Sequence, residues 1–171
     1  LDFGLGPGTG RAGQDGRLPH SMLGAKKLFP ALSSDYAAMT NAAIALFEAT
    51  GDSAYADRAG EFIGQLDRWH RDKDGTGYYL TASDSADVPI RIRGDVDEAI
   101  PSATAQVIEA LVRLASVSGD LDIEHKAWTT AEHAMGRAAQ QAYGQAGIVN
   151  ACALALEPLK LVLIDNPASP S

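Results

Sequence analysis

The sequence predicts a mainly α-helical protein built of about three helix hairpins, with one small antiparallel β-hairpin. In two long stretches, residues 37–69 and 103–143, apolar side chains recur at the spacing of an amphipathic helix. Each stretch contains a short stop, Thr50-Gly51-Asp52 in the first and Ser118-Gly119-Asp120 in the second. The two stops lie about 68 residues apart, which indicates a repeated helix-hairpin unit.

The composition excludes several classes of function. With 171 residues, 46% of them hydrophobic and 21% charged, the chain is long enough for one globular domain with a substantial core. The formal net charge is −8 and no basic run extends beyond Lys26-Lys27, so we expect no nucleic-acid partner. No apolar stretch approaches the roughly 20 residues of a membrane span, and no signal-peptide pattern is recognisable. We therefore expect no membrane partner and a cytoplasmic location.

The spacing of cysteine and histidine predicts no metal site and no cofactor. Cys152 is the only cysteine, which leaves no internal disulfide and no Cys-x-x-Cys pair. It lies in the apolar run 148–156, where we expect a buried core residue. His125 and His133 are eight residues apart on one predicted helix, which is too far for a shared metal ion.

The two ends of the chain differ in composition from the rest. Residues 1–16 contain six glycines and are expected to form a flexible connector. Residues 17–165 are expected to form the helical domain, and residues 166–171 a truncated tail. Both ends look cut, which predicts a piece of a longer protein. His20 follows the connector and is either an exposed loop histidine or a functional residue.

The first helix hairpin has recognisable caps. Its first helix is expected to begin after Ser33-Ser34-Asp35, whose side chains can accept hydrogen bonds from free backbone N–H groups. Gly51 can adopt the left-handed conformation that ends this helix, and Asp52 can cap the next one.

The second helix carries the strongest apolar stripe of the sequence and ends at His70. A histidine near a helix C-terminus is favoured as a charged cap, and we expect that role rather than catalysis. Gly60 and Gly64 lie one turn apart in this helix. Because each costs about 1 kcal/mol in a helix interior, we expect them to mark a close helix–helix contact.

The segment between the two helix hairpins is expected to contain the β-hairpin. Helical spacing ends at residues 72–77, and two extended runs follow, residues 78–81 and 88–92. In the second run apolar residues alternate with charged ones, as on a half-buried strand. We expect the two runs to pair, closed by residues 83–87.

The third helix is expected to start at Pro101-Ser102, which is a first-turn signal. Its partner, about residues 123–142, has alanines along one stripe and is suited to close packing. A third hairpin is expected to begin with a helix over residues 146–156, followed by a strand over residues 159–164.

Several short motifs, in their order and spacing, resemble one family. They are Asp35-Tyr36-Ala37-Ala38, residues 46–52, residues 72–79, Arg91, and residues 97–102. This pattern is similar to the C-terminal part of the thioredoxin-domain-containing proteins related to spermatogenesis-associated protein 20, over roughly residues 16–165. The resemblance implies a partial α/α toroid of the six-hairpin glycosidase type, similar in shape to N-acylglucosamine 2-epimerases. This chain would supply about half of the ring.

The junction formed by residues 91–105 matches the family only in part. Four positions match: Arg91, Asp97, Pro101 and Ser102. Four positions depart from the family's Tyr, Gly, Gly and Asn: Val96, Glu98, Ala103 and Thr104. The missing aromatic ring and carboxamide are groups suited to holding a sugar.

This junction is the candidate site, because loops and helix ends line the cleft of a helical toroid. Sugar chemistry commonly uses two carboxylates, so Asp97 and Asp35 are the predicted catalytic pair, with Asp95 or Glu98 as other partners for Asp97. The alternative is that Asp97 and Ser102 only satisfy the free N–H groups at a helix start.

The predicted substrate-binding side chains are either positive or hydroxyl-bearing. They are Arg91, Arg93, Ser102, Thr104, Tyr36 and Tyr78. The two arginines are suited to bidentate binding of an anionic substrate. They are equally suited to an ion network with the neighbouring carboxylates.

Two functions are consistent with these residues. The first is a carbohydrate-active domain that binds or transforms a sugar or sugar acid, with glycosidase- or epimerase-like activity if it is an enzyme. The second is a non-catalytic helical scaffold or protein-interaction domain. Half a toroid also exposes an apolar edge, so we expect contact with the remainder of its own chain and self-association through that edge.

Overall fold

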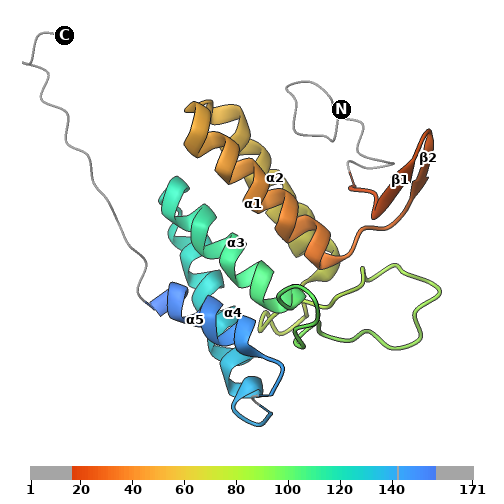
Figure 1. Ribbon diagram of the computed structural model, residues 1–171, viewed down its shortest axis with the longest axis vertical. Helices are drawn as coiled ribbons and strands as arrows, with labels where there is room; N and C mark the ends of the chain where they lie inside the picture. Colours follow the sequence, from red (N-terminus) through yellow and green to blue (C-terminus); the bar gives the residue numbers. More distant parts are fainter. Residues whose placement is uncertain (1–16, 142, 157–171) are drawn as a thin grey trace, which may run out of the picture.

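The computed structural model describes residues 17–141 and 143–156, and within them the protein is mainly helical (Figure 1). The helices of this described part are α1 (Ser33–Thr50), α2 (Ser53–His70), α3 (Ala103–Ser118), α4 (Leu121–Ala138) and α5 (Ala146–Leu156). Two short strands, β1 (Ser21–Leu23) and β2 (Lys26–Leu28), form an antiparallel hairpin. The prediction of a mainly α-helical fold with a small β-hairpin is confirmed. The predicted connector, the strand over residues 159–164 and the tail lie outside the described residues.

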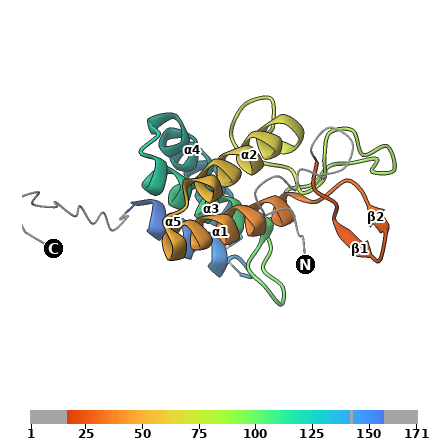
Figure 2. The same cartoon turned by 90° about the horizontal axis from the view of Figure 1, so that it is seen from above.

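The helices form two layers (Figure 2). Helix α3 packs against α1 on one side and α5 on the other, while α2 packs on α1 and α4 packs on α3 and α5. Large apolar side chains of α1, α2 and α3 and small alanines of α4 fill the space between the layers. Cys152 of α5 is buried in this core as predicted, and its thiol lies 3.4 Å from the carbonyl oxygen of Ala131. No helix among the described residues combines the length and apolar character that crossing a membrane requires.

The turns inside the two hairpins are built alike, as predicted. Gly51 and Gly119 both have positive φ, 71° and 68°, and end α1 and α3. The carboxylate of Asp52 accepts a hydrogen bond from the N–H of Ala54, and that of Asp120 accepts from Asp122. This arrangement satisfies free donors at the starts of α2 and α4.

The start of α1 differs from the prediction. Ser33 and Asp35 lie inside the first turn, not before it. The Asp35 carboxylate folds back and accepts a hydrogen bond from the N–H of Leu32 at 2.8 Å. The N–H of Ser33 donates to the carbonyl of Leu80 at 2.9 Å, so a distant loop provides the acceptor that a local cap would otherwise supply.

The predicted position of the β-hairpin is wrong. Residues 78–81 and 88–92 form no paired strands, although the Leu80 N–H donates to the Ile92 carbonyl. Instead, the N–H groups of Tyr79 and Ser83 donate to the carbonyls of His70 and Trp69 at the end of α2. The last carbonyls of α2 have no partner within the helix, and they accept the N–H groups that a β-hairpin would need for pairing between its strands. The actual hairpin lies earlier, over residues 21–28.

The explanation predicted for two helical glycines is also wrong. A Cβ atom built on Gly60 or Gly64 would meet nothing within 4 Å, so neither glycine marks a close helix contact. Gly64 is exposed and Gly60 is half-buried.

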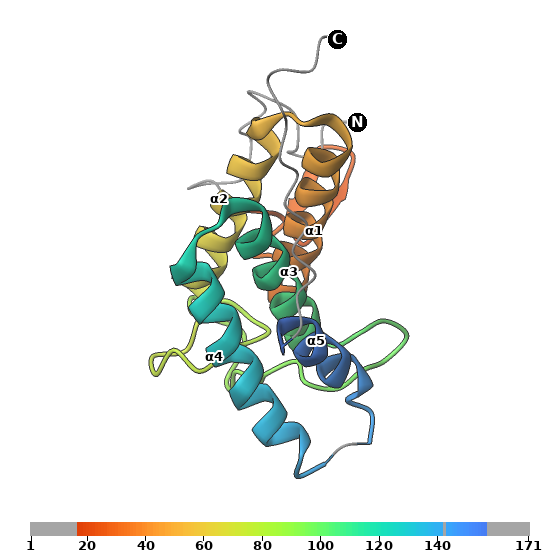
Figure 3. The same cartoon turned by 90° about the vertical axis from the view of Figure 1, so that its left-hand side faces the viewer.

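The connections differ sharply between the two ends of the helical body (Figures 1 and 3). Tight two-residue turns join α1 to α2 and α3 to α4 at one end, which we call the turn end. At the other end lie residues 17–32 and 71–102 and the connection between α4 and α5. We call this the loop end. It also contains the starts of α1, α3 and α5.

Candidate functional site

All the side chains that the sequence predicts as site residues belong to the loop end. They come from the first turn of α1, from residues 78–97, and from the start of α3. Hydrogen bonds tie these parts together: the Thr104 N–H donates to the Gly94 carbonyl at 3.0 Å, and the Asp97 N–H to that of Gly144 at 2.7 Å. These hydrogen bonds hold residues 94–97 against the start of α3 and against the residue that precedes Gln145 and α5.

Asp97 uses both carboxylate oxygens inside the fold. Oδ1 accepts a hydrogen bond from the N–H of Ser102 at 2.8 Å, and Oδ2 accepts one from Gly147 at 2.7 Å. Burial opposes ionisation of this carboxyl, but the two N–H donors outweigh it and hold its pKa below the usual value. Gly147 is required for this contact, because an added Cβ would lie 2.6 Å from Oδ1. Asp97 thus connects the starts of α3 and α5.

Asp95 joins the junction to the end of α4. Its Oδ2 accepts a hydrogen bond from Nε of Arg137 at 2.7 Å, and its Oδ1 accepts one from the hydroxyl of Thr104 at 2.5 Å. Burial raises the pKa of Asp95, but Arg137 and Thr104 together hold it below the usual value. The hydroxyl of Ser102 accepts from the Ala105 N–H at 3.2 Å and caps α3. These contacts use the polar groups of Ser102 and Thr104.

The two arginines of the junction turn toward the end of α2 and the residues after it. Arg91 donates from Nε and Nη2 to the carbonyl of Thr81 and from Nη2 to that of Trp69, and its guanidinium lies 4.2 Å from the centre of the Tyr79 ring. Burial lowers the pKa of Arg91. No salt bridge within the described residues joins either arginine to Asp95, Asp97 or Glu98.

Arg93 forms an ion pair with Asp72. The Asp72 carboxylate also accepts from the N–H of Thr76 at 2.7 Å and from its hydroxyl at 2.8 Å. Burial opposes ionisation of Asp72, yet Arg93 and Thr76 keep its pKa below the usual value. Gly77 leaves the space for Arg93, because a Cβ there would lie 2.5 Å from Nη1.

Tyr36 and His70 form a buried pair at the base of the loop end. Their rings meet edge to face with centroids 5.6 Å apart, and both side chains are almost fully buried. The Tyr36 hydroxyl accepts a hydrogen bond from the Leu18 N–H at 3.3 Å. Burial raises the pKa of Tyr36 and lowers the pKa of His70 to about 4. His70 is therefore neutral near pH 7, and the predicted charged helix cap is wrong.

Tyr78 is also buried and has an internal partner. Its hydroxyl donates to Oδ1 of Asp67 at 2.6 Å, and Oδ2 of Asp67 pairs with Lys126 of α4. Burial raises the pKa of Tyr78 far above its usual value. The ring therefore contributes to the contact between α2 and α4 and presents no face for stacking on a sugar.

His20 and Asp35 form the one pair at the loop end, among the described residues, that has the arrangement of an acid/base site. Nδ1 of His20 lies 2.7 Å from Oδ2 of Asp35, and the side chains are 41% and 28% exposed. The Asp35 carboxylate lies in the first turn of α1, where the helix dipole favours negative charge. A carboxylate on Nδ1 leaves Nε2 as the nitrogen that can exchange a proton with a bound molecule.

The described residues offer little to a metal ion. No group of three or more histidine, cysteine, aspartate or glutamate side chains within them is arranged to hold one. Asp72, in the turn that follows α2, binds protein donors instead.

Sequence reasoning missed the long-range partners of the predicted residues. Arg137 lies 42 residues from Asp95, and Lys126 lies 59 residues from Asp67. In the sequence, Arg137 and Lys126 look like ordinary cations on the surface of a helix, and no neighbouring residue indicates their distant carboxylate partners. His20 was recognisable only as a lone polar ring after the glycine-rich segment.

No protein-family model matches the chain. It is 33% identical over 95 residues to spermatogenesis-associated protein 20 of Mus musculus, and 32% identical over the same length to the Homo sapiens protein. The Rattus norvegicus protein is 30% identical. These matches cover 55% of this chain but only 11% to 12% of the relatives, so the chain spans a small part of their length. The chain is therefore related, distantly and through part of its length, to spermatogenesis-associated protein 20.

Proposed function

We propose that this chain is part of a thioredoxin-domain-containing protein related to spermatogenesis-associated protein 20, in which it forms part of an α/α toroid. The loop end binds or transforms a sugar or sugar acid in this proposal. The observation that carries it is the His20–Asp35 pair, part-exposed at the start of α1 with a 2.7 Å separation.

The packing of the helices supports a toroid. Helices α1, α3 and α5 lie in one layer and α2 and α4 in the other, so each hairpin adds one helix to each layer (Figure 2). Continuing this pattern would extend both layers beyond α5. The long loops gather at the end where α1, α3 and α5 begin, and binding residues are found disproportionately in loops placed by a rigid scaffold.

The chemistry assigned to the site is general acid/base catalysis. Asp35 holds His20 in one orientation, and Nε2 of His20 accepts a proton from, or returns it to, a hydroxyl or carbon of the bound sugar. Asp97 was the other predicted catalytic carboxylate, and its two backbone hydrogen bonds favour a structural role. The predicted pair of Asp97 and Asp35 is replaced by His20 and Asp35 in this proposal.

A thermal-shift screen against neutral sugars and sugar acids tests the site. At least one of these compounds is expected to raise the melting temperature of the wild-type protein, and His20→Ala is expected to abolish that rise. His125→Ala is the matched control, because His125 is an exposed histidine on α4 outside the loop end. A screen in which no compound raises the melting temperature, or an unchanged response in His20→Ala, would contradict the proposal.

A non-catalytic scaffold is the second candidate, and a specific observation favours it. Five side chains predicted to catalyse or to bind substrate each have at least one partner inside the protein: Arg91, Arg93, Asp97, Ser102 and Thr104. A scaffold would act through its surfaces. The apolar side chains exposed on α5 would then meet the remainder of the longer protein or a second copy of this chain.

A further inference from the structure

The end of α2 gathers positive charge in a protein whose formal net charge is −8. Four guanidinium groups lie against two aromatic rings there, each with its central carbon 4.1 to 5.1 Å from a ring centre: Arg17 and Arg68 at Trp69, and Arg91 and Arg93 at Tyr79. The two rings belong to one region. Arg91 donates to the Trp69 carbonyl, and the Tyr79 N–H donates to the carbonyl of His70, the last residue of α2.

Only two of these four cations have a carboxylate partner within the described residues. Arg17 and Arg93 each pair with an aspartate, whereas Arg68 and Arg91 form no salt bridge there. Arg68 is exposed, but Arg91 is partly buried, and burial lowers the pKa of Arg91 with no carboxylate to oppose it. A partly buried cation without a counter-ion is unfavourable, so an anion from solution would compensate its charge.

Arg91 is held in place and still has one nitrogen free. Its Nε and Nη2 donate to the carbonyls of Thr81 and Trp69. Its Nη1 has no partner among the described residues and is not enclosed by them, so it faces solvent. The same holds for the hydroxyl of Tyr79, on whose ring the guanidinium lies. A donor that is already fixed loses little freedom when a ligand binds to it.

We propose that Arg91 and Tyr79 bind the phosphate group of a small phosphate monoester. Nη1 of Arg91 and the Tyr79 hydroxyl donate to its oxygens, and the guanidinium supplies the missing counter-charge. A doubly charged phosphate gains more from this cation than a singly charged carboxylate does. The Trp69 and Tyr79 rings already lie against guanidinium groups, so the site recognises the phosphate and not a nucleobase. It shares no residue with the His20–Asp35 pair and does not rest on the function proposed above.

An NMR titration of the ¹⁵N-labelled chain with methyl phosphate at pH 7.5 and constant ionic strength tests this site. The amide signals of Tyr79 and Arg91 and the Nε–H signal of Arg91 are expected to shift, with a Kd on the order of 5 mM. Arg91→Gln is expected to weaken binding at least about fivefold. Tyr79→Phe removes only a hydroxyl without a protein partner, so it should fold normally and weaken binding about two- to threefold.

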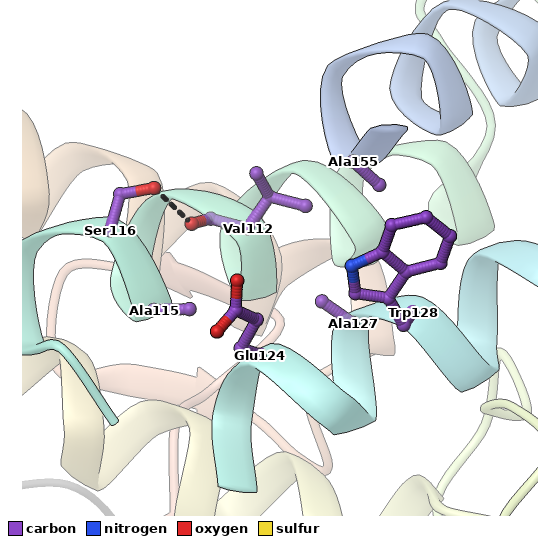
Figure 4. A pocket seen from close by; sticks show the side chains of 7 residues that line it. All are labelled: Val112, Ala115, Ser116, Glu124, Ala127, Trp128 and Ala155. Carbon is purple, nitrogen blue, oxygen red and sulfur yellow. Dashed lines mark hydrogen bonds between the residues drawn. The ribbon is translucent and has the colours of Figure 1, made fainter. Parts of the chain in front are cut away.

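Two controls separate this site from general effects of charge. Arg113→Gln removes a cation that pairs with Glu48, away from the end of α2, and is expected to leave binding unchanged. The indole signal of Trp128 is an internal control. Trp128 lines a shallow pocket between α3, α4 and α5 whose seven lining residues include the carboxylate Glu124 and no lysine, arginine or histidine (Figure 4). This signal is expected not to move.

Shifts confined to the starts of the helices would overturn the proposal, because helix N-termini attract any anion. Equal weakening by Arg91→Gln and Arg113→Gln would overturn it too, since the effect would then be one of net charge. Full binding by both Arg91→Gln and Tyr79→Phe would remove the two residues from the site. Acetate binding as tightly as methyl phosphate would contradict the preference for phosphate, and AMP binding more tightly would replace the assignment by a nucleotide site.

Discussion

Asp97 accepts hydrogen bonds from the backbones of two helix starts that lie 45 residues apart, Ser102 before α3 and Gly147 in α5. A carboxylate with two such donors is stabilised in its charged form, which the lowered pKa of Asp97 reflects. The sequence analysis predicted Asp97 as a catalytic carboxylate. The sequence around Asp97 is compatible with a catalytic role and with a structural role, and only its hydrogen-bond partners in the folded protein distinguish the two.

Replacing Asp97 by alanine is expected to lower the free energy of unfolding by about 2–4 kcal/mol, because two backbone donors lose a charged acceptor. Urea unfolding at pH 7 measures the change. Glu98→Ala is the matched control, because Glu98 is exposed and its substitution removes the same charge from the neighbouring position. A loss of similar size in both variants would show that the contacts of Asp97 contribute nothing specific.

The burial of His70 is expected to make the stability of the protein depend on pH. Its pKa is lowered from 6.5 to about 4, chiefly by burial, so the folded state holds it neutral while the unfolded state binds a proton below pH 6.5. The unfolded state therefore gains stability as the pH falls from 6.5 to 4. We expect a loss on the order of 3 kcal/mol across this window.

Urea unfolding at several pH values between 7 and 4.5 tests this prediction. His70→Asn cannot titrate and should show a flatter dependence in the same window, although its stability at pH 7 should be lower. The carboxyls with lowered pKa values, such as Asp72 and Asp95, lose their contribution only below about pH 4. Parallel pH profiles for the wild type and His70→Asn would refute the assignment.

At the scale of single elements, two glycines have opposite effects on stability. Gly64 lies in the interior of α2 with nothing within 4 Å of an added Cβ, so it only weakens the helix. Gly94 lies beside the start of α3, where an added Cβ would come 2.8 Å from the Cβ of Ala103. Gly64 therefore lowers the stability of α2, whereas Gly94 is required because a side chain there would clash with Ala103.

Alanine substitutions separate these two cases. Gly64→Ala is expected to raise the free energy of unfolding by about 1 kcal/mol, since alanine is the better helix former. Gly94→Ala is expected to lower it by about 1–3 kcal/mol, because the junction must move away from α3. Thermal and urea unfolding of both variants provide the comparison. Destabilisation by Gly64→Ala would show a contact that the structure lacks.

The elements that were predicted correctly carry local signals. The Gly-Asp stops depend on one backbone conformation and one side-chain cap, both set by neighbouring residues. The β-hairpin was misplaced because residues 88–92 have the alternation of a strand without its pairing. Ile90 and Ile92 are 77% and 60% exposed. The N–H groups of residues 79 and 83 donate to carbonyls at the end of α2, so they are not available for pairing between strands.

At the scale of the whole molecule, α5 is the last described helix of its layer and exposes apolar side chains. Val149 and Leu156, seven residues apart and therefore on the same side of this helix, are 47% and 59% exposed. In the pattern of the preceding hairpins, a further helix would pack beside α5. Since no other described residue covers these side chains, we expect them to favour association.

Sedimentation velocity over a range of concentrations is expected to show self-association that Val149→Lys reduces. A charge introduced into an apolar contact must either be buried without a partner, which is unfavourable, or prevent the contact from forming. Leu121→Lys is the matched control, because Leu121 is 75% exposed at the start of α4, away from this surface. A monomer at every concentration would contradict the prediction.

The sequence by itself determined the helical class, the two hairpin turns and the buried cysteine, because periodicity and capping act over a few residues. Tertiary structure decided the partners of the junction carboxylates, since Asp95 meets Arg137 and Asp97 meets the Gly147 N–H only when distant helices pack. It also decided that His70 is neutral, because burial depends on everything folded around the ring. The pairing of His20 with Asp35 has the same origin: the β1–β2 segment and the start of α1 meet only in the folded protein.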